Sequence, residues 1–121
     1  MSPTPKKHKV KRLTRTSDFR RVYQKGTRFK SPNIRLYIQQ MPTDAICLGV
    51  VVSKRVSKHA TDRNRIRRIV KEWFVHSGSE AHSLGRDIVI SIQSFSTLGA
   101  AGSKALRAEL HDLNKEALRN E

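Results

Sequence analysis

Apolar and polar residues recur with two different periods along this chain, and the two periods predict helices and strands in a definite order. The clearest helical period lies in residues 54–74, KRVSKHATDRNRIRRIVKEWF. This pattern predicts a helix that starts after Ser57, a candidate N-cap, and ends near residues 75–76. Its apolar residues fall at i, i+3, i+4, i+7 and i+8, one stripe of an α-helix that packs on a core: Ile66, Ile69, Val70, Trp73 and Phe74.

Strand-like patterns lie on both sides of this helix. Residues 33–40 alternate between apolar and polar side chains, which predicts a half-buried strand with Tyr37 on its polar face. Residues 45–53 and 86–92 contain short apolar runs rich in β-branched residues, as is typical of strands. Because only the turn-like segment 41–44 separates the first two strands, we expect them to pair as an antiparallel hairpin.

Two further helices are predicted near the ends of the chain. One lies within residues 13–26 and begins at an N-cap of Thr16 or Ser17. The other is capped by Ser103 and spans residues 104–119. The resulting order, α-β-β-α-β-α, predicts an α+β fold, an α/β sandwich with helices packed against one sheet. The apolar side of the last helix comprises Ala105, Leu106, Leu110, Leu113, Ala117 and Leu118.

The start of the chain differs in composition from the rest. Residues 1–11 contain two prolines, four lysines and almost no apolar residue, which predicts a disordered basic tail. A single domain over residues 12–121 follows from the remaining length. The tail either stays a solvated terminus or orders on RNA, and the sequence favours neither outcome.

The charge of the chain indicates a polyanionic partner. The sequence has 25 Lys and Arg against 10 Asp and Glu, a formal net charge of +15. Repulsion between like charges makes such an excess unfavourable for folding. The excess therefore indicates an anionic partner, which we expect to be nucleic acid, with an anionic membrane as a weaker alternative. The cations concentrate in the predicted helix. Most of them, and the neutral Asn64, lie opposite its apolar stripe or on the flanks: Asn64, Arg65, Arg67, Arg68 and Lys71, with Arg63 near the edge of the stripe.

No set of residues stands out for catalysis or metal binding. The ten acidic residues are dispersed, and the five histidines lack the spacing of a zinc site. The single cysteine, Cys47, excludes an internal disulfide and suits a reducing cytoplasm. No apolar run has the length of a membrane span. We therefore expect RNA binding by a single domain, without a protein active site, a membrane, a small-molecule substrate or a metal ion held by the protein alone.

The aromatic residues allow two interpretations. Phe19, Val22 and Tyr23 share one helical face, and this spacing favours a place in the core. Phe19 and Tyr23 could instead line a groove in which RNA bases stack. Tyr37 is the better stacking candidate, because it lies on the polar face of its strand beside Arg35.

The arginine motif in the central helix resembles the signature of a known family. Residues 63–68 read RNRIRR and follow VSKR at residues 52–55, and together they resemble the RNR signature of bacterial ribonuclease P proteins. The segments LTRTSDFRRVYQKG, IRLYIQQ, LGVVVSKRV and RDIVISI resemble that family's first helix and main strands. They occur in the same order, over residues 13–118.

The resemblance implies the protein subunit of ribonuclease P, a cytoplasmic endonuclease that removes the 5′ leader of precursor tRNA by hydrolysis. In this family a large RNA subunit carries the active site and uses Mg²⁺. One small basic protein per RNA binds that RNA and the single-stranded leader. The family also has a left-handed crossover around the signature helix, whereas general rules of topology predict a right-handed one.

The resemblance also implies roles for individual residues. The signature and the strand end before it match the surface for the catalytic RNA, and Lys71 lies on the same helical face: Lys54, Arg55, Arg63, Asn64, Arg65, Arg67, Arg68 and Lys71. Three aromatic residues match the contacts to the leader, with Arg35 beside one of them: Phe19, Tyr23 and Tyr37. The chain departs from the family at three places. Tyr23 stands where Phe is common, and Ser57 and His59 replace the Gly-Asn type entry that is frequent before the helix. Residues 91–93, SIQ, stand where an Arg often ends the strand.

Two other functional classes fit part of the sequence. A ribosomal-protein-like RNA-binding module shares the charge and the fold but needs no leader-binding aromatics. An autonomous metal-dependent nuclease requires converging carboxylates, which the sequence does not indicate. A basic face that is merely solvated leaves the concentration of charge in residues 54–71 unexplained.

Overall fold

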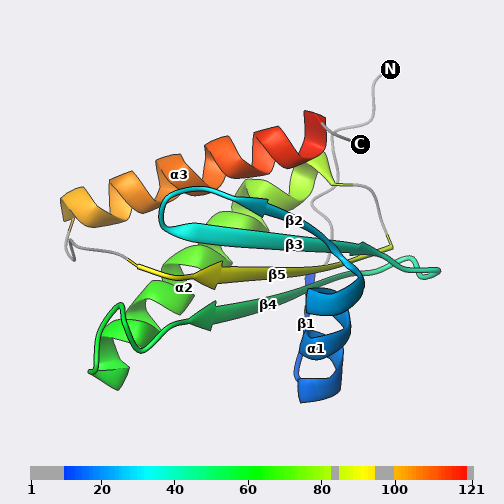
Figure 1. Cartoon of the computed structure of the whole chain (residues 1–121). Helices are drawn as coiled ribbons and strands as arrows, with labels where there is room; N and C mark the ends of the chain where they lie inside the picture. The colour runs from blue at the N-terminus through cyan, green and yellow to red at the C-terminus, as the bar shows by residue number, and fades with distance from the viewer. Residues whose placement is uncertain (1–9, 83–84, 95–99, 120–121) are drawn as a thin grey trace.

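The computed structural model describes residues 10–82, 85–94 and 100–119 and shows, within them, one mixed sheet of five strands covered by helices (Figure 1). The strands lie in the order β1-β4-β5-β3-β2. The α+β sandwich is therefore confirmed. The elements are β1 (Val10–Arg12), α1 (Thr16–Lys25), β2 (Thr27–Lys30), β3 (Ile34–Gln40), β4 (Ile46–Val52), α2 (Ala60–His76), the 3-10 turn η1 (Gly78–Ala81), β5 (Arg86–Ile92) and α3 (Ala100–Arg119).

Strand β5 lies at the centre of the sheet, and all seven of its residues are buried. It pairs in parallel with β4 and antiparallel with β3. The predicted hairpin of residues 33–40 and 45–53 is therefore wrong, because β5 separates β3 from β4. The physical reason is that β5 carries apolar residues on both faces, such as Val89 and Ile90, and a central strand buries both faces.

Helices cover both faces of the sheet. Helices α2 and α3 pack against one face, and α1 packs against the other (Figure 1). The apolar stripe predicted for α2 is confirmed, since Ile69 is partly buried and the other four residues are buried: Ile66, Val70, Trp73 and Phe74. Burying one such side chain contributes about 1.5–3 kcal/mol. The stripe therefore fixes α2 on the sheet and determines which of its residues face outward.

The connection from β4 through α2 to β5 is left-handed. In Figure 1 the parallel strands β4 and β5 run towards the left, β5 lies above β4, and α2 passes behind the sheet. A right-handed crossover would place α2 in front of the sheet, on the side where α1 lies. The handedness implied by the family resemblance is thus confirmed. It separates α2 from the sheet face that carries α1.

The entry to α2 differs from the prediction. The helix begins at Ala60 with His59 as its N-cap, so Ser57 is not the cap. Ser57 instead organises the loop before the helix. Its hydroxyl donates to Asp62 Oδ2 at 2.8 Å and accepts the His59 N–H at 3.1 Å.

Helices α1 and α3 also start at other residues than expected. Arg15 is the N-cap of α1, so Thr16 is already helical. Helix α3 begins at Ala100, because alanine is a strong helix former, and Ser103 therefore lies inside the helix. Ala105 is exposed, contrary to its predicted place on the apolar side. The other residues of that side are buried or, for the last one, partly buried: Leu106, Leu110, Leu113, Ala117 and Leu118.

Strands β1 and β2 are absent from the predicted set. Val10 and Lys11, which we expected in the tail, belong to β1 and pair in parallel with Ile46 and Cys47 of β4. Strands of three and four residues are too short to produce a recognisable period, and both contain cations. The remainder of the predicted tail, residues 1–9, lies outside the described residues.

Candidate RNA-binding surfaces

The outward face of α2 carries cations that are open to a partner. Asn64, Arg65 and Arg68 are exposed, and Arg67 is half-buried. Arg67 Nη1 donates to Asn64 Oδ1 at 2.7 Å, which holds these two side chains together. Among the described residues, no acidic side chain forms an ion pair with these arginines. Their guanidinium groups are therefore available to an anion.

Arg63, the first arginine of the motif, has a different environment. It is half-buried, and its Nη1 donates to the backbone oxygen of Ser57 at 2.8 Å. This bond joins the first turn of α2 to the loop that enters it. Arg63 therefore fixes the direction in which the exposed arginines of the helix project.

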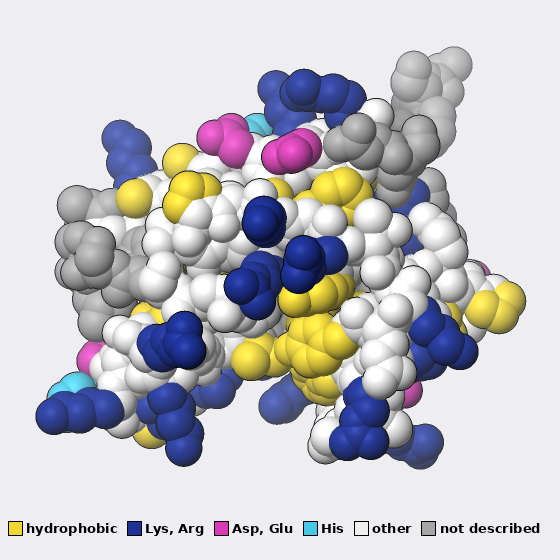
Figure 2. All heavy atoms as spheres, in the orientation of Figure 1, with side chains coloured by type: hydrophobic (Ala, Val, Ile, Leu, Met, Phe, Trp, Pro, Cys, Tyr) yellow, Lys and Arg dark blue, Asp and Glu magenta, His cyan; other side chains and the backbone are white. Residues whose placement is uncertain are grey.

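The loop between β4 and α2 adds two exposed cations, Lys54 and Arg55. The Arg55 N–H donates to Ser53 Oγ at 3.2 Å, and the Val56 N–H donates to the Ser53 oxygen at 3.0 Å, so the loop forms a tight turn. Figure 2 shows Lys and Arg side chains gathered over the beginning of α2. The predicted cationic residues before the helix thus extend the charge of α2 itself.

Arg12 belongs to the same surface, although we did not predict it. A hollow beside α2 is lined by Arg12 of β1 together with Asn64, Arg67, Arg68, Lys71 and Glu72. Burial lowers the pKa of Lys71, and the charges of Arg12 and Arg67 lower it further. Lys71 is half-buried, whereas the helical projection alone predicts that it points outward. The unpredicted strand β1, which brings Arg12 to its side, explains this difference. We call Arg12, Asn64, Arg65, Arg67, Arg68 and Lys71 the α2 surface.

A second candidate surface lies on the opposite face of the sheet, beside α1. The rings of Tyr23 and Tyr37 meet edge to face, with centroids 4.8 Å apart and planes at 79°. Tyr23 is 40% exposed, and Tyr37 is partly buried against Val22 and Val89. Burial, and to a lesser extent Tyr37, raises the pKa of Tyr23, so this hydroxyl stays protonated at neutral pH. Of the predicted face of the first helix, Val22 is core, whereas Tyr23 is available for stacking.

Phe19 packs on the same buried cluster as Tyr37 and also reaches the α2 surface, so it joins the two surfaces. Its ring packs on Gly49 so closely that a Cβ on this glycine would lie 2.4 Å from Phe19 Cε1. Phe19 is half-buried and lines a hollow at the edge of β4, beyond the end of β1. Arg67 and Lys71 line the same hollow. A residue assigned to the leader therefore lies close to residues assigned to the catalytic RNA.

Cations also lie beside Tyr37 on the sheet. Arg35 is two residues from Tyr37 on β3, so both side chains lie on the α1 side. Arg28 and Lys30 of β2 are the register partners of Tyr37 and Arg35, which places them on that side too. Figure 2 shows Lys and Arg side chains over β2 and β3, next to a hydrophobic patch beside α1. We call Tyr23, Tyr37 and Arg35 the tyrosine surface.

An ion pair anchors α1 to the sheet. Arg21 Nη2 lies 2.7 Å from Asp87 Oδ2 on β5 and 3.2 Å from Asp18 Oδ1. The hydrogen bond that Arg21 donates to Asp87 raises the pKa of Arg21. Burial, followed by the nearby Asp87, raises the pKa of the Cys47 thiol, which keeps this cysteine in its neutral form. The ion pair between Arg21 and Asp87 holds α1, and with it Tyr23, in place over the sheet.

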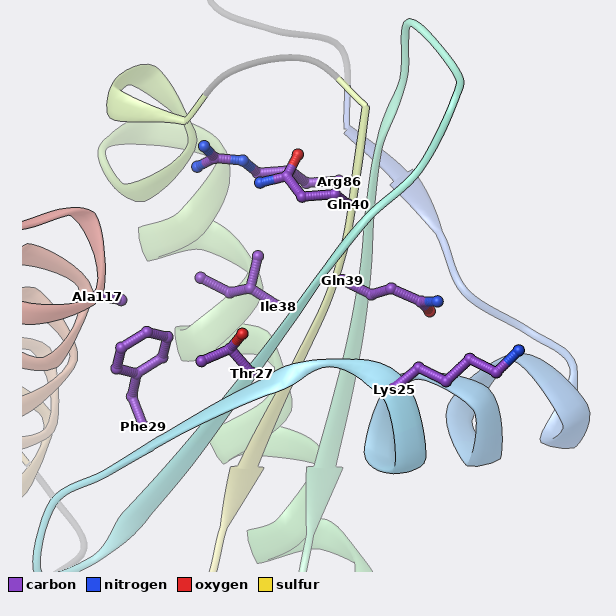
Figure 3. A pocket seen from close by; sticks show the side chains of 8 residues that line it. All are labelled: Lys25, Thr27, Phe29, Ile38, Gln39, Gln40, Arg86 and Ala117. Atoms are coloured by element: carbon purple, nitrogen blue, oxygen red, sulfur yellow. The ribbon is translucent and has the colours of Figure 1, made fainter. Parts of the chain in front are cut away.

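A further hollow, between β3 and the end of α3, is less suited to RNA. Figure 3 shows Lys25 and Gln39 on one side of β3, while Ile38, Phe29 and Ala117 lie on the other. The cation on that other side is Arg86, which is 3% exposed. Arg86 Nη1 lies 2.7 Å from His82 Nδ1, and His82 Nε2 lies 2.6 Å from Asn114 Oδ1. This buried chain of hydrogen bonds links β5 to α3.

Within the described residues, no three His, Cys, Asp or Glu side chains are grouped so that they could hold a metal ion. Across the same residues, no helix combines the length and apolar character needed to cross a membrane. The features that stand out are therefore the two basic surfaces on a mixed sheet. Basic surfaces of this kind are typical of proteins that bind nucleic acids.

Comparison with known proteins identifies the family. The model of the family described as Ribonuclease P matches residues 8–118, so the chain belongs to the ribonuclease P protein family. The ribonuclease P protein component of Desulforapulum autotrophicum is 32% identical over 116 residues, which cover 93% of each chain. The component from Clostridioides difficile is 39% identical over 82 residues, which cover 68% of this chain and 71% of the relative.

A solved structure supports the same assignment. The ribonuclease P protein of Staphylococcus aureus has a TM-score of 0.72 and 26% identity, and the match covers 90% of this chain and 96% of that protein. Family membership makes this chain a protein component of ribonuclease P, and hence an RNA-binding protein in tRNA processing. Its partner is the ribonuclease P RNA.

Proposed function

We propose that the chain is the non-catalytic subunit of ribonuclease P and uses two separate surfaces for two RNAs. The α2 surface binds the catalytic RNA, and the tyrosine surface, with Phe19, binds the 5′ leader of precursor tRNA. The observation that carries this proposal is the left-handed crossover. It places α2 on one side of the sheet and Tyr37 on the other, so both RNAs can be bound at once.

The α2 surface suits a folded RNA. Four of its cations project from one rigid helix, and Arg12 lies beside them on β1, so they can neutralise phosphates spaced along a backbone and release counterions. Arg guanidinium groups form paired hydrogen bonds with phosphate oxygens. Asn64 adds a neutral donor and acceptor, and its bond to Arg67 fixes the direction of both side chains.

The tyrosine surface suits a single strand. Exposed aromatic rings stack on unpaired bases with little sequence preference, at about 1–3 kcal/mol per base. Such tolerance is needed if leaders differ in sequence from one precursor to another. Arg35, on the same side of β3, supplies a charge for the leader backbone.

In this proposal the RNA subunit carries the hydrolytic chemistry and binds Mg²⁺. Among the described residues no cluster of three carboxylate, histidine or cysteine ligands occurs that could form an all-protein metal cage. The chain contributes charge neutralisation instead. Lower repulsion between RNA phosphates allows the RNA to fold and bind its functional Mg²⁺ at lower concentration. One protein per RNA remains a prediction.

Reconstitution tests this proposal. The full chain would be combined with a bacterial ribonuclease P RNA at low Mg²⁺, and cleavage of precursor tRNA would be measured. We expect little cleavage by either component alone and rapid cleavage by the two together. Cleavage by the protein alone, abolished by a chelator, would instead favour an autonomous metal-dependent nuclease.

A further inference from the structure

We propose that Arg28 and Lys30, which together with Arg35 are here named the β2–β3 patch, extend the leader path beyond the tyrosine surface and bind leader phosphates distal to the cleavage site. This inference rests on the proposed function, since it lengthens the same site. Arg28 and Lys30 lie on a strand that the sequence patterns did not indicate.

Register places the patch directly beside Tyr37. Arg28 is the Cα partner of Tyr37, and Lys30 is the Cα partner of Arg35. Neighbouring strands lie about 4.8 Å apart, and alternate residues of a strand lie about 7 Å apart. The four side chains therefore form a compact rectangle with one aromatic and three cationic corners. A single strand stacked on Tyr37 can lie across this rectangle, with the three cations close to its phosphates.

The patch is electrostatically unfavourable in the free protein. Lys30 and Arg35 are directly opposite across the two strands, an arrangement of like charges that destabilises a sheet. All three side chains are exposed, and no acidic side chain among the described residues forms an ion pair with them. Glu109, which is near the turn between these strands, is occupied by other donors. The repulsion within the patch is relieved when an anionic strand binds.

The backbone beneath the patch is rigidly held. Asn33, in the turn between β2 and β3, donates to Glu109 of α3 through its N–H at 2.9 Å and through Nδ2 at 2.8 Å. The Ser31 hydroxyl donates to the same carboxylate. The Gln93 N–H donates to the Asn33 oxygen at 2.8 Å, which ties the turn to the end of β5. The cations therefore project from a fixed platform, which reduces the entropy lost on binding.

A hollow at the end of the patch continues the path. It is lined by Lys30, Ser31, Pro32, Arg35 and Gln93. Lys30 and Arg35 supply positive charge, and Gln93 supplies an amide that can bond to a base edge or a phosphate. We assign the patch to the leader rather than to the catalytic RNA because it is continuous with Tyr37 and lies across the sheet from α2.

The test uses the reconstituted holoenzyme and precursor tRNAs with leaders of about four and about twelve nucleotides, within the span of single-strand sites. The variant is Arg28→Gln with Lys30→Gln. The matched control is Lys104→Gln with Arg107→Gln, which removes the same charge from exposed positions of α3. Affinity for each precursor and for mature tRNA would be measured across a range of salt concentrations.

We expect the variant to lose affinity for the long-leader precursor by on the order of fivefold to tenfold, with a salt slope shallower by about 1.4. Affinity for the short-leader precursor and for mature tRNA should match the control. An equal loss for both leader lengths, or no loss, overturns the inference. Tyr37→Ala separates this result from the proposed function. If Tyr37→Ala leaves both precursors unaffected, the tyrosine surface itself is not the leader site.

Discussion

The α2 surface and the tyrosine surface both bind RNA in this account, but they are built differently. The α2 surface has four cations on a helix, with Arg12 beside them on β1, and no aromatic ring among the residues that define it. The tyrosine surface has two rings in edge-to-face contact, with cations to one side. A phosphate backbone is recognised by charge alone, whereas an unpaired base offers a face for stacking. The composition of each surface therefore indicates which form of RNA it binds.

The two surfaces also differ in how their residues are held. The α2 surface depends on one long helix, fixed by its buried stripe and by the bond from Arg63 to Ser57. The tyrosine surface depends on the contact between two elements, α1 and the sheet, which the Arg21–Asp87 ion pair stabilises. Substitutions of the exposed arginines of α2 should thus affect affinity without affecting the fold, whereas substitutions beneath α1 should affect both.

The largest effect is expected from Arg65→Ala combined with Arg68→Ala. Loss of two exposed phosphate contacts should weaken binding to the ribonuclease P RNA by on the order of 10- to 100-fold and reduce the salt slope by about 1.5. Filter binding across salt concentrations measures both values. Lys104→Ala with Arg107→Ala on α3 serves as the control. An unchanged salt slope would show that the arginines of α2 do not face phosphates.

A smaller and more selective effect is expected from Tyr37→Ala. Loss of one stacking platform should reduce the affinity of the holoenzyme for precursor tRNA by about 1–3 kcal/mol, with mature tRNA unaffected. Tyr37→Phe keeps the ring and should retain most of the affinity. Competition binding with precursor and mature tRNA provides the comparison, and equal losses for the two would exclude a role in leader stacking.

Gly49→Ala tests the residue that joins the two surfaces. The new Cβ would lie 2.4 Å from the Phe19 ring, so the ring must move, and we expect a loss of about 1–3 kcal/mol in the free energy of unfolding. Denaturant titration measures this loss. In the double variant with Phe19→Leu, the smaller side chain should relieve the collision. If the two single effects simply add, the contact between Phe19 and Gly49 is not the cause.

The smallest effect is expected from Lys71→Gln. The pKa of Lys71 lies below its ordinary value of 10.5, so folding disfavours the protonated form and stability should rise as the pH increases towards 10.5. The variant lacks this dependence and should be more stable at neutral pH by a few tenths of a kcal/mol, a small value because the side chain is partly solvated. Thermal unfolding at several pH values measures the difference. A variant that is less stable than the wild type would contradict the unfavourable interaction of the Lys71 charge with Arg12 and Arg67.

The sequence was informative where a pattern was long. The stripe of α2 extends over nine residues, so its buried face and its exposed arginines could both be predicted. Alternation along residues 33–40 correctly placed Arg35 and Tyr37 on the opposite side of the strand from Ile34 and Ile38. The RNR motif, together with the order of the other segments, was enough to indicate the family.

The sequence was less informative where contacts between distant segments determine strand pairing and the position of a side chain. The pairing of β5 between β3 and β4 could not be predicted from proximity in the sequence, which favoured a hairpin. Arg12 and Arg28 were missed because their strands are short and their partners lie far away along the chain or across a turn. The burial of Phe19 depends on Gly49, which has no side chain to signal the contact.

The central claim is that the two surfaces contact two different RNAs, and site-directed crosslinking tests it most directly. Cys47 would first be changed to Ala, so that one new cysteine can carry a photoactivatable group. Asn64→Cys places the group on the α2 surface, and Arg35→Cys places it on the tyrosine surface. In the holoenzyme saturated with precursor tRNA, we expect Asn64→Cys to crosslink to the catalytic RNA and Arg35→Cys to the leader. Crosslinking of both positions to the same RNA would contradict the claim.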